Sequence, residues 1–167
     1  MTNDSQIQYL LDRFAIQDVL ATYAKGQDDF QGNQCEGTLA TWARVFTDDG
    51  EVDYTSGGGP RGPWREMLAW MRGTPEEPGG MTGAFGRWQH MLGLPIVAIE
   101  GDTASARHDL LATHTTVDQA DGGVHFYDAC TFTDELVRTP EGWRIRFRML
   151  EVHWAGALQT AKDFSLQ

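Results

Sequence analysis

The residues best suited to move protons in this sequence begin with His90, which follows Trp88 and precedes an apolar run at 91–99. This order places an imidazole beside aromatic surface at the start of a buried strand. Such a histidine can act as a general base, because its ordinary pKa lies close to neutral pH. Packing at the edge of a strand is the alternative, so a catalytic role needs support from other residues.

Two neighbouring aspartates, Asp28 and Asp29, stand at the end of the first predicted helix. That end carries the negative pole of the helix dipole and gives a carboxylate no stabilisation. Pairing with a histidine is one reason for an acidic residue there, since a carboxylate bonded to one ring nitrogen makes the other nitrogen more basic. Two solvated loop aspartates are the alternative. Tyr23, slightly earlier, either packs in the core or presents its hydroxyl to a substrate carbonyl.

A second histidine, His108, lies in the alternating segment 103–116 and shares its parity with Ala104, Ala106 and Ala112. If the alanines face the interior of the fold, His108 faces it too. A buried histidine bonded to a backbone carbonyl is the alternative. His114 lies on the same face, but about 20 Å away at ~3.3 Å per residue, too far to share an ion with His108. We therefore predict neither a metal site nor a cofactor.

Composition excludes several classes of partner. The chain has 167 residues and a formal net charge of -11, with no basic stripe, which argues against nucleic acid and anionic membrane surfaces as partners. Its two cysteines are too few for a disulfide framework, and no apolar run reaches the length of a membrane span. We expect a cytoplasmic protein whose residues 1–167 form one domain.

Helical patterns dominate the first half of the chain. Apolar residues recur at helical spacing from about 7 to 27, in two sets half a turn apart, so this helix is either covered on two sides or broken near Phe14. Asp4 or Ser5 is expected to cap it. A second helix is predicted around 39–46, ending in a turn at 48–50 before a strand at 51–55. A third is predicted at 64–71.

Strand patterns dominate the second half. Segments 89–99, 103–116, 124–137 and 143–154 read as strands joined by short turns, and the Pro- and Gly-rich loop 73–83 reads as a lid or a surface excursion. Helices followed by a run of strands indicate an α+β fold, with the helices on one face of a strongly curved, mostly antiparallel sheet that encloses an apolar pocket.

Several segments, weak individually but in a specific order, resemble the SnoaL-like family of the nuclear transport factor 2-like superfamily. The resemblance spans almost the whole chain and implies a cone-shaped α+β barrel. It rests on these segments: Asp12-Arg13-Phe14-Ala15-Ile16-Gln17-Asp18 followed by Tyr23 and Asp28, Phe46-Thr47-Asp48-Asp49-Gly50, Gly101-Asp102-Thr103-Ala104, Asp134-Glu135-Leu136-Val137-Arg138, and Glu141-Gly142-Trp143-Arg144-Ile145 with Arg148.

Residue roles follow from this resemblance. Members similar to scytalone dehydratase, the bile acid dehydratases and the hexachlorocyclohexane dehydrochlorinase pair a strand histidine with an aspartate after the first helix. This implies His90 as the base and Asp28, rather than Asp29, as its partner. Tyr23 resembles a tyrosine aimed at the substrate oxygen, and His108 resembles the second histidine of scytalone dehydratase. An arginine near the leaving group is either Arg146 or Arg148, which alternation places on one face.

The predicted function is that of a cofactor-independent lyase or isomerase that removes a proton from a hydrophobic, cyclic, oxygenated small molecule. A polyketide-type cyclase is one alternative, and a non-catalytic binding module or oxygenase small subunit is another. We expect a homodimer or homotrimer. The catalytic residues are predicted to be His90, Asp28, Tyr23 and His108, and the substrate-binding residues to be Trp42, Tyr54, Phe85, Trp88, Tyr127 and Arg148.

Overall fold

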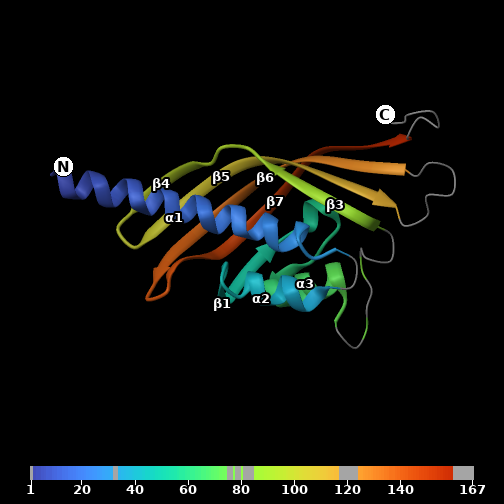
Figure 1. Cartoon of the computed structure of the whole chain (residues 1–167), viewed down its shortest axis with the longest axis horizontal. Helices are drawn as coiled ribbons and strands as arrows, with labels where there is room; N and C mark the ends of the chain where they lie inside the picture. Colours follow the sequence, from blue (N-terminus) through green and yellow to red (C-terminus); the bar gives the residue numbers. More distant parts are fainter. Residues whose placement is uncertain are drawn as a thin grey trace.

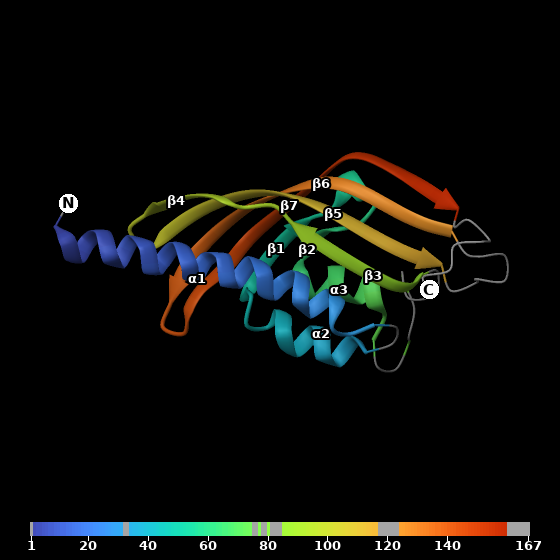
Figure 2. The same ribbon diagram turned by 45° about the horizontal axis from the view of Figure 1, so that its top comes forward.

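A strongly curved sheet forms one layer of the molecule, and three α-helices lie under its arch (Figures 1 and 2). The computed structural model describes residues 2–31, 34–74, 77, 80, 85–116 and 124–159. The predicted α+β class is confirmed. The lid predicted at 73–83 and the turn predicted at 121–123 lie largely or wholly outside the described residues.

The sheet has seven strands in the described part of the chain, in the order β2-β1-β7-β6-β5-β3, and β4 also pairs with β5. β1 runs parallel to β7, and the other pairs are antiparallel. Because the paired path ends at β2 on one side and at β3 and β4 on the other, the sheet is open rather than a closed barrel. The strands are β1 (Phe46–Asp53), β2 (Arg61–Pro63), β3 (Phe85–Leu92), β4 (Ile96–Glu100), β5 (Thr103–Thr116), β6 (Val124–Thr139) and β7 (Gly142–Gln159).

The first helix, α1 (Asn3–Asp28), is continuous and starts earlier than predicted. Its cap is Thr2, whose hydroxyl accepts from the backbone N–H of Ser5 at 3.3 Å, so the caps expected from Asp4 or Ser5 were wrong. Among the described residues, no helix combines the length and apolar composition needed to cross a membrane.

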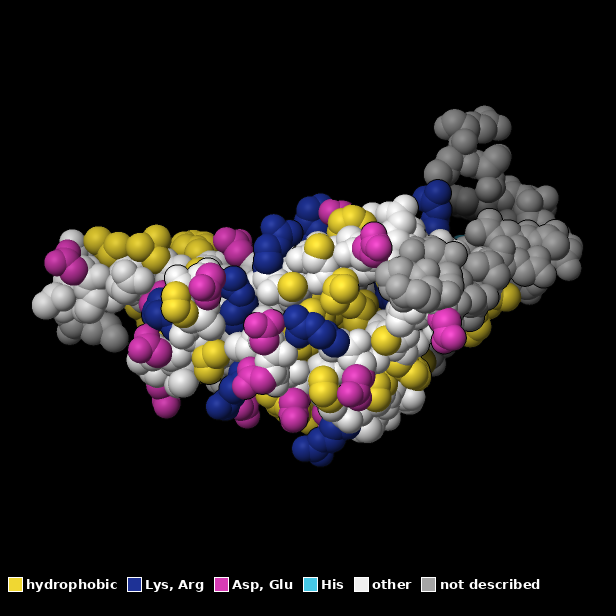
Figure 3. Space-filling model, turned by 90° about the horizontal axis from the view of Figure 1, so that it is seen from below, with side chains coloured by type: hydrophobic (Ala, Val, Ile, Leu, Met, Phe, Trp, Pro, Cys, Tyr) yellow, Lys and Arg dark blue, Asp and Glu magenta, His cyan; other side chains and the backbone are white. Residues whose placement is uncertain are grey.

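Only one of the two apolar faces of α1 is covered. Ile16, Leu20 and Tyr23 are buried against the sheet, whereas the earlier set is exposed within the described chain, with Phe14 at 62%. Figure 3 shows apolar side chains gathered at the N-terminal end of the molecule, where α1 lies in Figure 1. The helix is therefore neither broken near Phe14 nor covered on both sides. The exposed set consists of Ile7, Leu10, Leu11 and Phe14.

The second helix, α2 (Cys35–Trp42), ends before the predicted turn at 48–50. Phe46 already belongs to β1, because it pairs with Ile145 of the parallel strand β7. The register of this pairing shifts between Phe46 and Glu51, so the turn-forming residues at 48–50 make an irregularity inside a strand. The short 3-10 helix η1 (Thr55–Gly57) follows β1, and α3 (Trp64–Arg72) confirms the predicted third helix.

The single strand predicted at 89–99 is two strands, β3 and β4, which lie one after the other along the same edge of β5. Gly93 donates its N–H to the carbonyl of Asp109 at 2.7 Å, and Pro95 has no N–H to donate. The chain therefore leaves the edge after Gly93 and rejoins it at Ile96.

The alternation of β7 does not hold through its length. Glu135 pairs with Phe147 while Leu136 pairs with Ile145, so Arg146 is an extra residue in β7. Such a bulge reverses which parity faces inward. Arg146 is exposed and bonds Glu135 at 2.8 Å, whereas Arg148 is fully buried. The prediction that both arginines share one face was wrong for this reason.

Candidate active site

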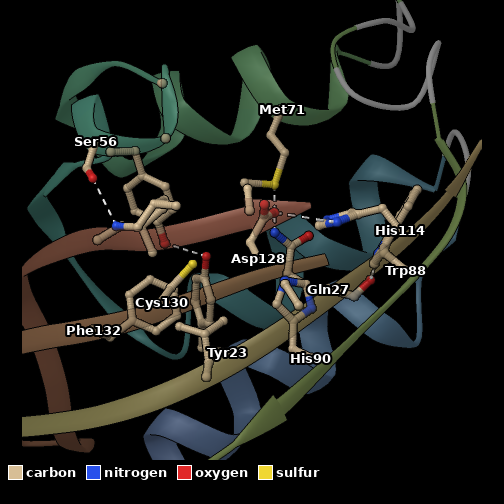
Figure 4. Close-up of a pocket in the computed structure, with 18 of the residues that line it drawn as sticks. Tyr23, Gln27, Ser56, Met71, Trp88, His90, His114, Asp128, Cys130 and Phe132 are labelled. Carbon is tan, nitrogen blue, oxygen red and sulfur yellow. Dashed lines mark hydrogen bonds and ion pairs between the residues drawn. The ribbon is translucent and has the colours of Figure 1, made fainter. Parts of the chain in front are cut away.

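A cavity of about 350 Å³ lies between the curved sheet and the helices α1 and α3 (Figure 4). Much of its wall is apolar, and a few polar groups from separate elements reach it. This size and composition suit a small apolar ligand that is oriented by a few hydrogen bonds. The apolar wall includes Trp70, Met71, Leu110, Ala112, Cys130, Phe132, Leu150 and Val152.

His90 on β3 lines this cavity and is bonded to Asp28 at the end of α1. The ring nitrogen Nδ1 lies 2.7 Å from Oδ1 of Asp28, and the backbone N–H of His90 donates to Oδ2 at 2.9 Å. An ionised carboxylate only accepts, so Nδ1 carries the proton in neutral His90. Nε2 is then the unprotonated nitrogen, and it bonds no group within the described residues.

Gln31 fixes the end of α1 to β3. Its amide nitrogen donates to the carbonyls of Asp28 at 2.6 Å and Trp88 at 3.0 Å, and its amide oxygen accepts the N–H of Trp88 at 3.1 Å. These bonds hold the helix end beside the strand that carries His90. Asp29, the other candidate partner, forms an ion pair with Lys25 instead.

Two buried tyrosines face the cavity from α1 and the end of β1. The hydroxyls of Tyr23 and Tyr54 are 2.5 Å apart. Burial raises the pKa of Tyr23, an effect that the Arg148 guanidinium opposes, and burial raises the pKa of Tyr54 well above its ordinary value. Both hydroxyls therefore keep their protons. One of these protons is shared within the pair, which leaves the other for a bound oxygen.

His114 on β5 and Asp128 on β6 also line the cavity, and the sequence-based prediction missed both. His114 Nδ1 lies 3.8 Å from Asp128 Oδ2, and its ring centroid lies 6.1 Å from that of His90 (Figure 4). Burial lowers the pKa of His114 to about 4, and burial also raises the pKa of Asp128. The signal that would have found His114 is the inward parity that it shares with Ala112.

Arg72 on α3 supports the wall around Trp88. Its guanidinium lies 4.1 Å from the Trp88 ring and donates to Oε1 of Gln27 at 2.7 Å and 3.1 Å. The indole N–H of Trp88 donates in turn to the carbonyl of Gln27 at 2.7 Å. Arg72 and Gln27, both lining residues, were missed because nothing in the local sequence pattern brings α1, α3 and β3 together.

The chain matches a known family. A family model described as a SnoaL-like domain matches residues 8–149. The chain belongs to the SnoaL-like family. An uncharacterized protein of Mycobacterium tuberculosis is 31% identical to it over 134 residues, which cover 80% of either chain, and an uncharacterized protein of Mycobacterium bovis matches equally.

Solved structures share the SnoaL-like fold. Hexachlorocyclohexane dehydrochlorinase LinA-type3 from Novosphingobium barchaimii has a TM-score of 0.71 and 20% identity, covering 96% of this chain and 99% of that one. A putative scytalone dehydratase from Novosphingobium aromaticivorans has a TM-score of 0.68 and 18% identity, covering 97% and 93%. At sequence identities this low, the structural similarity establishes a shared fold and nothing about function.

The SnoaL-like domain places His108 away from the cavity. Its side chain is buried further along β5, outside the cavity lining, and its two ring nitrogens have no hydrogen-bond partner in the described part of the domain. Burial and the nearby Arg148 lower its pKa to about 3, so the ring is neutral. His108 therefore lies outside the cavity lining, and the alternative, a bond to a backbone carbonyl, is not seen within the described residues either.

Four of the predicted substrate-binding residues do not line the cavity. Trp42 lies in the core behind Tyr23, with ring centroids 4.5 Å apart. Arg148 is buried in an ion pair with Asp134. Phe85 packs on His114, and Tyr127 packs on an exposed tryptophan of β7, on the outward parity. Tyr54 and Trp88, the other two, do line the cavity of the SnoaL-like domain.

Proposed function

We propose that this protein is a cofactor-independent lyase or isomerase of the dehydratase type, in which His90 removes a proton from a carbon atom of the substrate. The observation that carries the proposal is the bonded pair of Asp28 and His90 at the wall of an apolar cavity. Two proteins that share this fold bear the names of elimination reactions, dehydrochlorination and dehydration, which supports elimination as the reaction class.

The base in this mechanism is Nε2 of His90. Asp28 accepts a hydrogen bond from Nδ1–H, which fixes the tautomer, and its carboxylate stabilises the imidazolium that forms when Nε2 takes a proton. The His90 side chain is only 10% exposed and the surrounding wall is largely apolar, which limits the access of water to the base.

The hydroxyl pair of Tyr23 and Tyr54 supplies the complementary group. A donor aimed at a carbonyl oxygen stabilises the negative charge that develops when the neighbouring carbon loses its proton. Because the two hydroxyls are 2.5 Å apart and one of their protons is free, a single substrate oxygen fits this pair best. The substrate is therefore a cyclic ketone or a related oxygenated ring, with a proton next to the carbonyl and a leaving group one carbon further.

A general probe of the base is 5-nitrobenzisoxazole, a flat apolar molecule that loses a proton from carbon while its N–O bond breaks and a coloured phenolate forms. We expect turnover by the intact protein and a loss of about 10²–10⁴-fold in kcat/KM for His90→Ala. The control is His153→Ala, which changes an exposed histidine on β7 and leaves the rate unchanged. A binding module would hold the probe without converting it, and equal rates for the intact protein and His90→Ala would exclude the proposed base.

A further inference from the structure

We propose that Asp128 is the proton donor of this site, which protonates the leaving oxygen while His90 takes the proton from carbon. This inference rests on the proposed function and adds a second catalytic residue to it. It also narrows the substrate to one whose leaving group needs a proton, such as a hydroxyl group.

The sheet register places the two residues in one row. His90 on β3 pairs with Ala112 on β5, and Ala112 pairs with Asp128 on β6. Residues paired across neighbouring strands point to the same face of a sheet. All three residues line the cavity. At ~4.8 Å per strand, the backbone positions of His90 and Asp128 are about 10 Å apart.

Ala112 makes this arrangement suitable for a ring. Ala112 lies between the base and the acid in the row. Its methyl group is small, so it leaves space for a substrate while keeping that part of the cavity wall apolar. A substrate ring lying over Ala112 has His90 at one end and Asp128 at the other. The two groups then reach neighbouring carbon atoms, as an elimination requires.

The surroundings of Asp128 favour its protonated form. In the described part of the chain its one ion-pair contact is with His114, at 3.8 Å, and His114 is neutral above a pKa of about 4. Burial raises the pKa of Asp128, so more of this carboxyl stays protonated than at an exposed aspartate. Other titratable groups on the cavity wall are His90 on β3, Cys130 on β6, Arg72 on α3, Tyr23 on α1 and Tyr54 after β1.

The alternatives to Asp128 as donor are weaker. Asp28 accepts two hydrogen bonds from His90, so both of its carboxylate oxygens are engaged behind the base. Burial raises the pKa of Cys130 to about 11, which makes its thiol a poor acid. The pair Tyr23 and Tyr54 is assigned to the carbonyl oxygen. Asp128 is the remaining carboxyl on the described cavity wall.

With His90 as the base and Asp128 as the acid, every proton that moves in an elimination has a donor and an acceptor. The proton on carbon moves to Nε2 of His90, its bonding electrons form the new double bond, and the C–O bond breaks. The leaving oxygen takes the proton of Asp128 and departs as water. The imidazolium of His90 lowers the pKa of Asp128, so charging the base strengthens the acid in the same step. Net transfer of a proton from His90 to Asp128 restores the starting state.

The test compares two probes that lose the same carbon proton and give the same product. For 3-hydroxy-1-indanone the leaving group is hydroxide, which needs a proton, and for 3-acetoxy-1-indanone it is acetate, which leaves as a stable anion. We expect Asp128→Asn to lower kcat by about 10²–10⁴-fold with the hydroxy probe and less than about 10-fold with the acetoxy probe. His90→Ala is expected to lower both rates. The control Asp109→Asn, on the exposed face of β5, is expected to change neither.

The outcomes separate this inference from the proposed function. Equal losses with both probes, or no loss, would show that Asp128 is not a proton donor. If the intact protein converts 5-nitrobenzisoxazole but neither indanone probe, the proposed base stands, and the Asp128 carboxyl is then titrated by carbon-13 NMR. A pKa above that of the exposed Asp109 supports the donor role, and a pKa equal to it overturns the inference. If it converts none of the three probes, the proposed function fails and this inference fails with it. Circular dichroism of each variant checks that the fold is retained.

Discussion

The carboxylate of Asp28 binds His90 at two points, with one oxygen on the ring nitrogen Nδ1 and the other on the backbone N–H. The second bond fixes the strand position that carries the ring, and the first fixes the orientation of the ring. Because α1 ends at Asp28 and β3 carries His90, this pair also joins the two elements on which the proposed base depends.

Replacing Asp28 by Asn tests the ring contact. The amide keeps an oxygen for the backbone N–H but presents a donor or a weak acceptor to Nδ1, so the correct tautomer and the stabilisation of the imidazolium are lost. We expect kcat/KM for 5-nitrobenzisoxazole to fall by about 10²-fold or more. The matched control is Asp29→Asn, which removes only the ion pair with Lys25. Equal rates for the two variants would contradict the assigned partnership.

The buried ion pair of Arg148 and Asp134 predicts a large difference between two neighbouring arginines. Arg148→Met leaves the carboxylate of Asp134 buried without a partner, and we expect a loss of about 3–5 kcal/mol in the free energy of unfolding. Arg146→Met removes an exposed pair with Glu135, with an expected change within about 0.5 kcal/mol. The free energy of unfolding of both variants is measured by urea denaturation, with tryptophan fluorescence as the signal. Similar losses would mean that both side chains share one environment.

The sequence predicted the elements better than their register. Periodicity correctly placed α3, β5 and the long part of α1, because each buries one face. The bulge at Arg146 was not predictable, since it is created by the pairing of β7 with β6 and carries no residue signal of its own. Gly93 and Pro95 did signal the break between β3 and β4, but the apolar residues around them concealed it.

For a similar reason, the sequence predicted some residues of the candidate site and missed others. The partnership of Asp28 and His90 followed from the resemblance to a family, and the geometry agrees with it. Parity placed both His108 and His114 on the inward face of β5, but parity does not tell which end of a strand meets packed core and which meets open cavity. The cavity lies at the end that carries His114.

His108 is predicted to cost stability rather than to support turnover. Its ring is buried and its nitrogens make no hydrogen bond among the described residues, Nδ1 lying 3.9 Å from the Asp134 carboxylate, so His108→Leu removes a desolvation cost of about 1–3 kcal/mol. Its folded pKa, about 3, lies below the unfolded value of 6.5, so the unfolded chain binds more protons below pH 6.5 and stability falls with falling pH.

The measurement for His108 is urea denaturation at pH 7 and pH 5. The intact protein is expected to lose about 2 kcal/mol through this one group between the two values, and His108→Leu to be spared that loss. The rate with 5-nitrobenzisoxazole is expected to stay unchanged. A variant that is less stable than the intact protein at both pH values would show that the ring has a partner that stabilises it.

Asp12 and Arg138 join α1 to the hairpin of β6 and β7. Two guanidinium nitrogens of Arg138 each donate to one carboxylate oxygen of Asp12 at 2.7 Å, and the indole N–H of Trp143 donates to the same carboxylate at 3.2 Å. Hydrogen bonds from Arg138 lower the pKa of Asp12 to about 2, against the opposing effect of burial. Several of the residues that identify the family therefore stabilise the fold rather than contact a substrate.

This lowered pKa predicts the direction of the acid sensitivity. Because the folded pKa of Asp12 lies below the unfolded value of 3.8, its contribution is fully present above pH 3.8 and is lost as the pH falls towards 2. We expect Asp12→Asn to cost about 1–2 kcal/mol at pH 7, allowing for the partial exposure of Arg138, and about half as much at pH 3. The control Asp102→Asn removes the exposed second partner of Arg138 and should cost less than about 0.5 kcal/mol. A cost for Asp12→Asn that does not shrink between pH 7 and pH 3 would mean that the carboxylate charge is not what joins the helix to the hairpin.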